Sequence, residues 1–188
     1  DAMMLGSGQF QGMTLAAIAT QLGKPFEDVL IDDIGPNGPG AAHFVMNRDV
    51  MRRLLLAPHV MIASDGSPTM RHPRGHGTFA RVIREFVRER GELDLAAALH
   101  KMTGLPAATL GLDRCQPPRG MLRAGHAADV LVFDPDAVND AATFSAPFEH
   151  ALGFEQVMVN GSFVVDDGTL TKRRPGRLLR HVSNAAER

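Results

Sequence analysis

Short apolar runs that alternate with helical patterns constrain the fold of this 188-residue chain more than any other feature. The two clearest runs are AAHFVM at residues 41–46 and VMIA at residues 60–63, and turn-forming residues bound each of them. Asn47 can cap a helix between the two runs, and a second helical pattern follows the later run. Strands of a parallel sheet are apolar along their whole length because helices cover both faces of the sheet. The order strand, helix, strand, helix therefore predicts βα units and an α/β fold.

The strongest helical pattern lies in TFARVIREFVRER, residues 78–90. Its apolar residues recur at i, i+3, i+4, i+7 and i+8, which places them on one face of an amphipathic helix. These residues are Phe79, Val82, Ile83, Phe86 and Val87. Closer to the N-terminus, Thr14 is the expected N-cap of a helix that runs to about Leu22, and Pro25 is the expected first residue of another.

The second part of the chain has a different pattern, rich in short strands and turns. ADVLVFD at residues 128–134 predicts one strand, and FEQVMVNGSFVVDDG predicts a hairpin with Asn160-Gly161 at its turn. We therefore expect two parts, which are residues 1–112 as the α/β part and residues 113–188 as a small β-rich domain. The basic and polar end of the chain is expected to be a surface tail.

The charge balance and the hydropathy pattern exclude several classes of protein. Lys plus Arg number 20 and Asp plus Glu number 21, so the chain has no general positive field to hold nucleic acid or an anionic membrane. No apolar run approaches the ~20 residues that a membrane-spanning helix needs. Cys115 is the single cysteine, which excludes an intrachain disulfide and a cysteine-clustered metal site. A cytoplasmic location is therefore the expected one.

Asp65 lies where an apolar run ends and a turn begins, in the stretch VMIASDGSP. If residues 60–63 form a parallel strand, Asp65 stands at its carboxyl end, where ligands bind in parallel α/β folds and where barrel enzymes place catalytic residues. Aspartate is also a common turn residue, because its side chain accepts hydrogen bonds from nearby backbone N–H groups. Position alone leaves a catalytic and a structural interpretation of Asp65 open.

Several motifs around and after Asp65 resemble those of one enzyme family. The stretch HPRGHGTFARV at residues 72–82, with SDG before it and DAATF at residues 140–144, is similar to the N-acyl-D-amino-acid deacylases, the D-aminoacylase branch of the amidohydrolase superfamily. KMTGLPAATLGL and the later ADVLVFD resemble many amidohydrolases, including dihydroorotases and hydantoinases. The resemblance runs from about Gly12 to Leu179, which is less than half of a typical member. It implies the last βα units of a metal-dependent-hydrolase (β/α)8 barrel, followed by part of a small β-sandwich domain.

The same resemblance implies roles for individual residues. Asp65 matches the aspartate beside the family's metal site, which acts as general base on the attacking water and then delivers the proton to the leaving amine. Zn²⁺ is the implied cofactor, with Asp65 as a ligand, since it lowers the pKa of a water and polarises a carbonyl. Arg74 matches a substrate-binding arginine, whose guanidinium can hold an α-carboxylate with two parallel hydrogen bonds. His72 and His76 flank Arg74, and either can contact the substrate or orient the loop, although a structural or solvent-facing role is the expected one for both.

The remaining histidines and the cysteine are assigned no chemistry. His43 lies in a predicted strand and is expected to be a buried, hydrogen-bonded histidine. The others show no metal-ligand spacing and are expected at the surface or at helix ends, namely His59, His100, His126, His150 and His181. Cys115 is expected to be a structural thiol.

The chain departs from the family in its metal ligands. Members carry a His-x-His pair at the first barrel strand, a metal-binding cysteine and further histidine ligands, and the sequence has no His-x-His pair. Asp65 alone provides fewer than the three or four ligands that zinc needs. We therefore expect a fragment that is inactive in isolation, with the other zinc ligands supplied by a missing N-terminal barrel segment or by a partner chain.

Three hypotheses about function follow, in order of preference. The first is a metal-dependent hydrolase that releases a free D-amino acid and a carboxylate from a small-molecule N-acyl-D-amino acid. The second keeps the superfamily but changes the substrate to a cyclic amide, as in hydantoinases and dihydroorotases. The third is a non-catalytic scaffold module that folds or oligomerises alone. No nucleic-acid or membrane partner is expected, and a homo-oligomer stays open.

Overall fold

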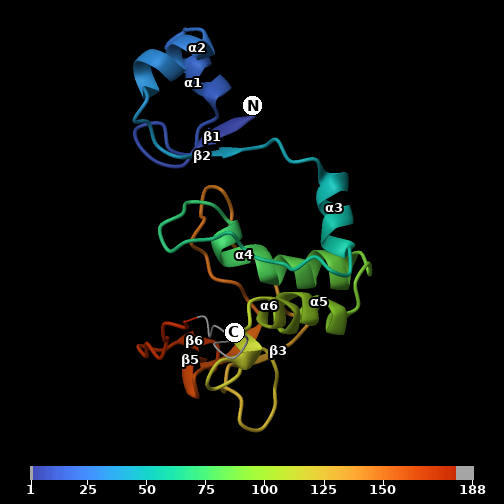
Figure 1. Ribbon diagram of the computed structural model, residues 1–188. Helices are drawn as coiled ribbons and strands as arrows, with labels where there is room; N and C mark the ends of the chain where they lie inside the picture. The colour runs from blue at the N-terminus through green and yellow to red at the C-terminus, as the bar shows by residue number, and fades with distance from the viewer. Residues whose placement is uncertain (1, 181–188) are drawn as a thin grey trace, which may run out of the picture.

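The computed structural model describes residues 2–180 and contains two antiparallel sheets with a group of helices between them (Figure 1). The two-stranded sheet belongs to an N-terminal unit at the top of Figure 1, and the four-stranded sheet lies at the bottom. Within the described residues, every pair of named strands is antiparallel. The chain is a mixed α and β structure, as predicted, but the parallel pairing expected of βα units does not form between its described strands.

The N-terminal unit has a core of its own, in which Leu5, Ile18 and Val29 are buried. Thr14 caps the first helix as predicted, since its side chain accepts a hydrogen bond from the backbone N–H of Ala17 at 3.2 Å. The elements of the unit are β1 (Met3–Leu5), α1 (Leu15–Leu22), α2 (Phe26–Asp28), the π-helical turn η1 (Val29–Ile34) and β2 (Ala41–His43).

The predicted buried strand over residues 41–46 is wrong in its length and in its burial. β2 ends at His43 and pairs only with β1, with Ala42 opposite Met4. His43 is exposed rather than buried, and so are the three apolar residues that follow it, Phe44, Val45 and Met46. A strand is buried on both faces only where layers pack on both of its sides. β2 lies in a two-stranded sheet and has no such cover within the described residues.

Residues 60–63 form no strand, so the second predicted strand is also wrong in this chain. The segment is nevertheless packed, because Ile62 is buried against Val82 and Ala98. The backbone N–H of Ile62 donates to the carbonyl oxygen of Lys101 at 3.1 Å. The apolar run reflects this burial, whereas a parallel ladder needs a neighbouring strand, which residues 2–180 do not place beside it.

The helices lie where the sequence predicts them, with one difference in what they bury. Asn47 caps α3 as predicted, with its side chain 3.0 Å from two backbone N–H groups of the first turn. Val82, Ile83 and Phe86 are buried, whereas Phe79 is 43% exposed. The helix changes from α to π winding at Val82, so positions on the two sides of that change no longer share one 3.6-residue face. The elements are α3 (Arg48–Leu56), α4 (Arg74–Arg81), its π-helical continuation η2 (Val82–Glu89), α5 (Leu95–Met102), α6 (Gly104–Thr109) and the 3-10 turn η3 (Leu112–Arg114).

The C-terminal sheet forms as predicted. β3 pairs with β4, and β4 pairs with β5 in the hairpin predicted around Asn160-Gly161. The φ angles of these two residues are 48° and 77°, and a type I′ turn needs positive φ at both central positions. The strands are β3 (Val130–Phe133), β4 (Phe154–Val159), β5 (Ser162–Asp166) and β6 (Thr169–Leu170).

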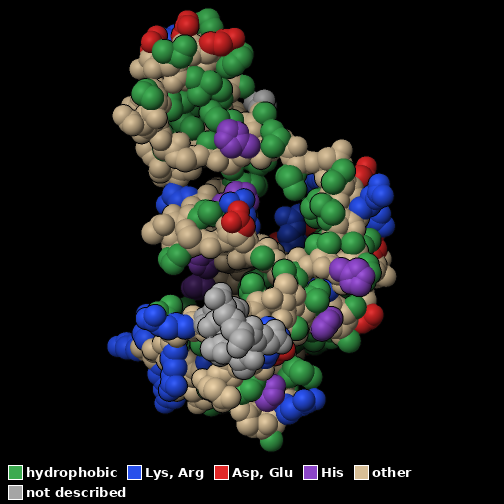
Figure 2. Space-filling view, in the orientation of Figure 1, with side chains coloured by type: hydrophobic (Ala, Val, Ile, Leu, Met, Phe, Trp, Pro, Cys, Tyr) green, Lys and Arg blue, Asp and Glu red, His purple; other side chains and the backbone are tan. Residues whose placement is uncertain are grey.

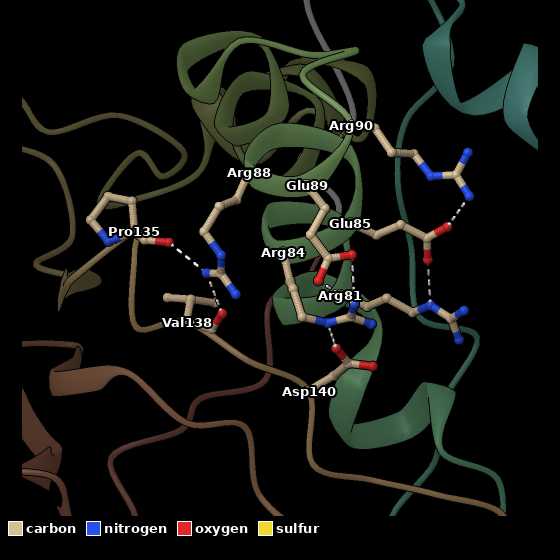
Figure 3. A network of polar contacts seen from close by, with 9 residues as sticks. All are labelled: Arg81, Arg84, Glu85, Arg88, Glu89, Arg90, Pro135, Val138 and Asp140. Atoms are coloured by element: carbon tan, nitrogen blue, oxygen red, sulfur yellow. Dashed lines mark hydrogen bonds and ion pairs between the residues drawn. The ribbon is translucent and has the colours of Figure 1, made fainter.

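The loop after β3 joins the C-terminal sheet to the helices (Figure 3). Val138 is fully buried in a cluster with Ala80 of α4. Arg88 of η2 donates from one nitrogen to two carbonyl oxygens of the loop, those of Pro135 at 2.9 Å and Val138 at 2.8 Å. These contacts fix the strand-rich part of the chain against the helices that carry the candidate site.

After β6 the chain continues as an irregular and mostly exposed segment to residue 180, as the predicted surface tail requires. The rest of that tail, residues 181–188 with His181, lies outside the described residues. The division into residues 1–112 and 113–188 stays a prediction. No helix in the described part of the chain is long and apolar enough to cross a membrane.

Candidate active site

Asp65 lies in a loop whose backbone touches the first turn of α4, and this turn carries Arg74. A Cβ added to Gly66 would lie only 2.6 Å from the Cα of Gly75, so any larger residue at position 66 pushes the two segments apart. The backbone N–H of Gly66 donates to Ser64 Oγ at 3.2 Å, which closes the turn. Asp65 has a φ of 46°, in the left-handed region that costs a non-glycine residue roughly 1–2 kcal/mol. The Ser-Asp-Gly turn is therefore a strained turn held against the start of α4.

The Arg74 guanidinium contacts both the side chain and the backbone of Asp65. Its Nη2 lies 2.8 Å from Asp65 Oδ2, and its Nε donates to the Asp65 carbonyl oxygen at 3.1 Å. The Asp65 side chain is 84% exposed and the Arg74 side chain is 39% exposed, so solvent and a ligand can reach the pair. An exposed ion pair adds little to stability. Within residues 2–180, Nη1 of Arg74 has no hydrogen-bond acceptor, which leaves part of the guanidinium available to an anion.

His72 fixes the start of the helix that carries Arg74. Its Nδ1 accepts a hydrogen bond from the backbone N–H of Arg74 at 3.1 Å, which requires an imidazole without a proton on Nδ1. Burial lowers the pKa of His72, the Arg74 guanidinium lowers it further, and Asp65 opposes both effects. The environment therefore favours the neutral imidazole that this hydrogen bond needs.

His76, two residues after Arg74, is held by aromatic rings. Its ring meets Phe148 edge-on, with centroids 5.7 Å apart at 87°, and lies 5.7 Å from the ring of His150. Its Nδ1 is buried and has no hydrogen-bond partner among the described residues. These contacts agree with a structural or orienting role for His76, and a contact with substrate stays a prediction.

A pocket of about 320 Å³ lies beside this loop. One side of it comes from residues 72–81, around the start of α4, and the other from residues 140–144. The second side is the DAATF motif, which the sequence marked as specific but to which it assigned no role. Within it, Phe144 lies edge-on to His72, with ring centroids 4.9 Å apart at 78°.

The residues present do not by themselves form a metal site. Within the described residues, no group of three or more His, Cys, Asp or Glu side chains lies close enough together to hold a metal ion. Asp65 is the one predicted ligand, and a single exposed carboxylate does not meet the three or four ligands that zinc needs.

The residues that were assigned no chemistry are placed largely as predicted. Cys115 is buried, and its thiol lies 2.9 Å from the carbonyl oxygen of Leu112, in keeping with a structural role. Of the histidines expected at the surface or at helix ends, His59, His100 and His150 are exposed. His126 is half-buried, and the prediction of a buried His43 is wrong, because His43 is the exposed last residue of β2.

A comparison with protein families identifies the class to which this arrangement belongs. The model of the amidohydrolase family matches residues 14–165, which is most of the chain and includes both segments of the candidate site. The chain belongs to the amidohydrolase family.

Three relatives from Alcaligenes xylosoxydans xylosoxydans place it more closely. The chain is 39% identical to N-acyl-D-aspartate deacylase over 176 residues and 40% identical to D-aminoacylase over 173 residues. It is 43% identical to N-acyl-D-glutamate deacylase over 149 residues. These matches cover 93%, 91% and 78% of this chain. The chain spans about a third of the length of these relatives, because the matched part is 34%, 34% and 30% of each.

Solved structures agree with this placement. A crystal structure of D-aminoacylase, described as defining a novel subset of amidohydrolases, matches with a TM-score of 0.84 and 38% identity, over 95% of this chain and 38% of that protein. The N-acyl-D-glutamate deacylase of Bordetella bronchiseptica matches with a TM-score of 0.82 and 36% identity, over 96% of this chain and 38% of that protein. That structure contains zinc and a phosphonate inhibitor that mimics the tetrahedral intermediate. The predicted resemblance to N-acyl-D-amino-acid deacylases is therefore confirmed.

Proposed function

We propose that this chain is the C-terminal part of a metal-dependent hydrolase that cleaves the amide bond of N-acyl-D-amino acids, giving a D-amino acid and a carboxylate. The observation that carries the proposal is the contact between Asp65, in its loop, and Arg74, in the first turn of α4. The contact brings together two groups, a carboxylate that can move a proton and a guanidinium that can bind a substrate carboxylate. Relatives with this activity in their names, 39–43% identical to the chain, support the same reaction.

Asp65 and Arg74 divide the work between them. Hydrolysis adds water across the C–N bond, so one proton must leave the water and one must reach the departing nitrogen. The Asp65 carboxylate takes the first proton and delivers it to the amine, which needs a side chain that is open to the substrate. Arg74 holds the α-carboxylate of the substrate through Nη1, the guanidinium nitrogen that does not contact Asp65. This pairing places the bond to be cleaved beside the carboxylate that moves the proton.

The cofactor that we propose is zinc, with Asp65 as one ligand and the others outside this chain. Zinc, when bound, supplies the polarisation that a poor electrophile such as an amide needs. In the same proposal, the helical part of the chain completes a (β/α)8 barrel and the C-terminal sheet belongs to a small β-sandwich. The part of the relatives that this chain does not match, about two thirds of their length, is the proposed source of the other strands and ligands.

Exposed apolar side chains support the need for such a partner segment. Figure 2 shows hydrophobic side chains over the N-terminal unit and α3. Val45 and Met46 are each 73% exposed, and Val50 and Leu54 on α3 are 53% and 54% exposed. A missing barrel segment of the same protein is the proposed cover, and a partner chain or a second copy is the alternative. The predicted cytoplasmic location stays a prediction.

The test is hydrolysis by the full-length protein that carries this chain, loaded with zinc and offered N-acetyl-D-amino acids, their L-enantiomers and a hydantoin. We expect release of the free D-amino acid only. Asp65→Asn keeps nearly the same shape, and we expect it to lower kcat by about 10²–10⁴-fold with folding intact. Hydrolysis of the hydantoin instead would support a cyclic-amide hydrolase, and activity that survives Asp65→Asn would refute the assigned role. A zinc-loaded protein with no hydrolase activity would favour the scaffold.

A further inference from the structure

Residues 140–150, here called the strap, cross from the C-terminal part of the chain to residues 71–76, where a loop ends and α4 begins at Arg74. The strap begins at an ion pair in which Arg84 Nε donates to Asp140 Oδ1 at 2.6 Å (Figure 3). Both side chains are largely buried, at 23% and 13% exposure. Arg84 also donates from Nη1 to both carboxylate oxygens of Glu89, at 2.8 and 2.9 Å. The guanidinium is thereby held in place on η2, and the start of the strap is held with it.

Beyond this anchor, the strap contacts both histidines of this segment with aromatic rings. Phe144 lies edge-on to His72 with centroids 4.9 Å apart, and Phe148 lies edge-on to His76 at 5.7 Å. Arg71 lies over the Phe148 ring at 5.4 Å. Two ring contacts and a cation–π contact on one short segment restrict how its imidazoles can turn.

The orientation of His72 decides what its nitrogens can do. Its Nδ1 accepts from the backbone N–H of Arg74 at 3.1 Å, at the first residue of α4. A rotation of the ring would break this bond and leave the Arg74 N–H without its acceptor. Phe144 therefore restrains the His72 ring, and the His72 ring fixes the backbone of Arg74. From that backbone the Arg74 guanidinium reaches Asp65.

We propose that the strap positions Arg74 for the substrate carboxylate, through the chain of contacts from Phe144 to His72 Nδ1 to the Arg74 backbone. His72 is in this view a positioning residue that acts through Arg74. The inference rests on the proposed deacylase function, and it assigns part of substrate binding to the C-terminal module. Loosening the contacts raises KM for an N-acyl-D-amino acid and leaves kcat nearly unchanged, since Asp65 keeps its own turn.

Two substitutions at His72 separate the roles of its two nitrogens. In His72→Asn the side-chain oxygen falls near the position of Nδ1 and can accept from the N–H two residues on, as in an Asx turn. In His72→Gln the oxygen falls near the position of Nε2, and the bond to Arg74 is lost. With the full-length zinc protein and N-acetyl-D-amino acids, we expect His72→Asn to keep KM within about twofold and His72→Gln to raise it about five- to tenfold. Phe144→Ala should raise KM by a similar factor.

His100→Gln is the matched control, since His100 is exposed on α5 outside the loop. Should Phe144→Ala fail to fold, Phe144→Leu tests the same contact with most of the volume kept. If His72→Gln has normal KM and His72→Asn is impaired, Nε2 contacts the substrate and the inference is wrong. Normal KM in both His72 variants, or in a folded Phe144 variant, also overturns it. If the wild-type protein hydrolyses no N-acyl-D-amino acid, the proposed function itself is wrong. That result is distinct from a failure of this inference, which requires an active wild-type protein.

Discussion

Replacing Gly66 by alanine tests whether the contact between the Asp65 loop and the start of α4 positions the candidate site. The added Cβ would lie 2.6 Å from the Cα of Gly75 and 3.2 Å from Ser64 Oγ. Ser64 can rotate away, but the Gly75 contact is with backbone and cannot. Carbon atoms pack at about 3.5–4.0 Å, so the loop and the first turn of α4 must move apart by about 1 Å. Gly66 has no positive φ, so the alanine adds this steric conflict and no strain of backbone conformation.

The expected effect on catalysis is larger than the effect on stability. A displacement of about 1 Å between Asp65 and Arg74 is enough to lower kcat/KM by on the order of 10²-fold in an enzyme that depends on their geometry. Overpacking of this kind costs about 1–3 kcal/mol of unfolding free energy. The assay is kcat/KM of the full-length zinc protein for an N-acetyl-D-amino acid, together with a urea unfolding curve.

Two further glycine variants show whether the contact itself is responsible. Gly40→Ala is the control, because a Cβ there meets no atom within 4 Å and Gly40 has no positive φ. Gly75→Ala adds a methyl group on the other side of the same contact, but its Cβ would make only ordinary contacts, at 3.9 Å. We expect a much smaller loss for Gly75→Ala than for Gly66→Ala. A kcat/KM for Gly66→Ala equal to that of Gly40→Ala would refute the reasoning.

Two other predictions concern buried and exposed side chains away from the loops. Lys101 is 3% exposed, and burial lowers its pKa. Between the lowered pKa of the folded state and the unfolded value of about 10.4, the amine takes up a proton on unfolding, so the unfolding free energy rises with pH across this range. The Ala57 carbonyl that Lys101 contacts keeps a backbone N–H partner, so Lys101→Met should leave the unfolding free energy unchanged or raise it by about 1 kcal/mol. The variant should also lose the rise in stability at alkaline pH, which thermal unfolding at a series of pH values measures. A loss of stability above about 2 kcal/mol would contradict this prediction. If a barrel segment covers the exposed halves of Val50 and Leu54, replacing each by serine should destabilise the full-length protein by about 1 kcal/mol in urea unfolding. Leu122→Ser, at an 80% exposed position, is the control. Equal small effects of all three substitutions would exclude that cover.

Elements set by neighbouring residues were predictable from the sequence. Thr14 and Asn47 cap their helices with their own side chains, and Asn160-Gly161 turns its hairpin with its own backbone. Each of these signals acts over three or four residues, so residues close in sequence are enough to form it. The strand predicted over residues 60–63 does not form, and the one predicted over residues 41–46 is reduced to the three residues of β2. A strand depends on a neighbour, which an apolar run does not identify.

The candidate site divides in the same way. Asp65 and Arg74 are nine residues apart, and the motif that contains them carries their pairing within one short stretch of chain. The ring contact between His72 and Phe144 joins positions far apart in the sequence, and neither a period nor a spacing predicts it. DAATF was visible as a motif, but its contact with the loop depends on the anchoring of Asp140 by Arg84, which only the packed structure contains.

The exposed surface and the incomplete site point to the same partner. Val45 and Met46 follow a strand, and Leu54 lies on the helix after them, so one continuous stretch of chain carries these exposed apolar side chains. A (β/α)8 barrel buries such residues under the strands and helices of its other units. It also places catalytic groups from several strands at one face, so the segment that covers these side chains is also the natural source of further ligands near Asp65. Supplying that segment in trans should therefore bury the apolar surface and restore hydrolysis together, whereas a scaffold partner would bury the surface alone.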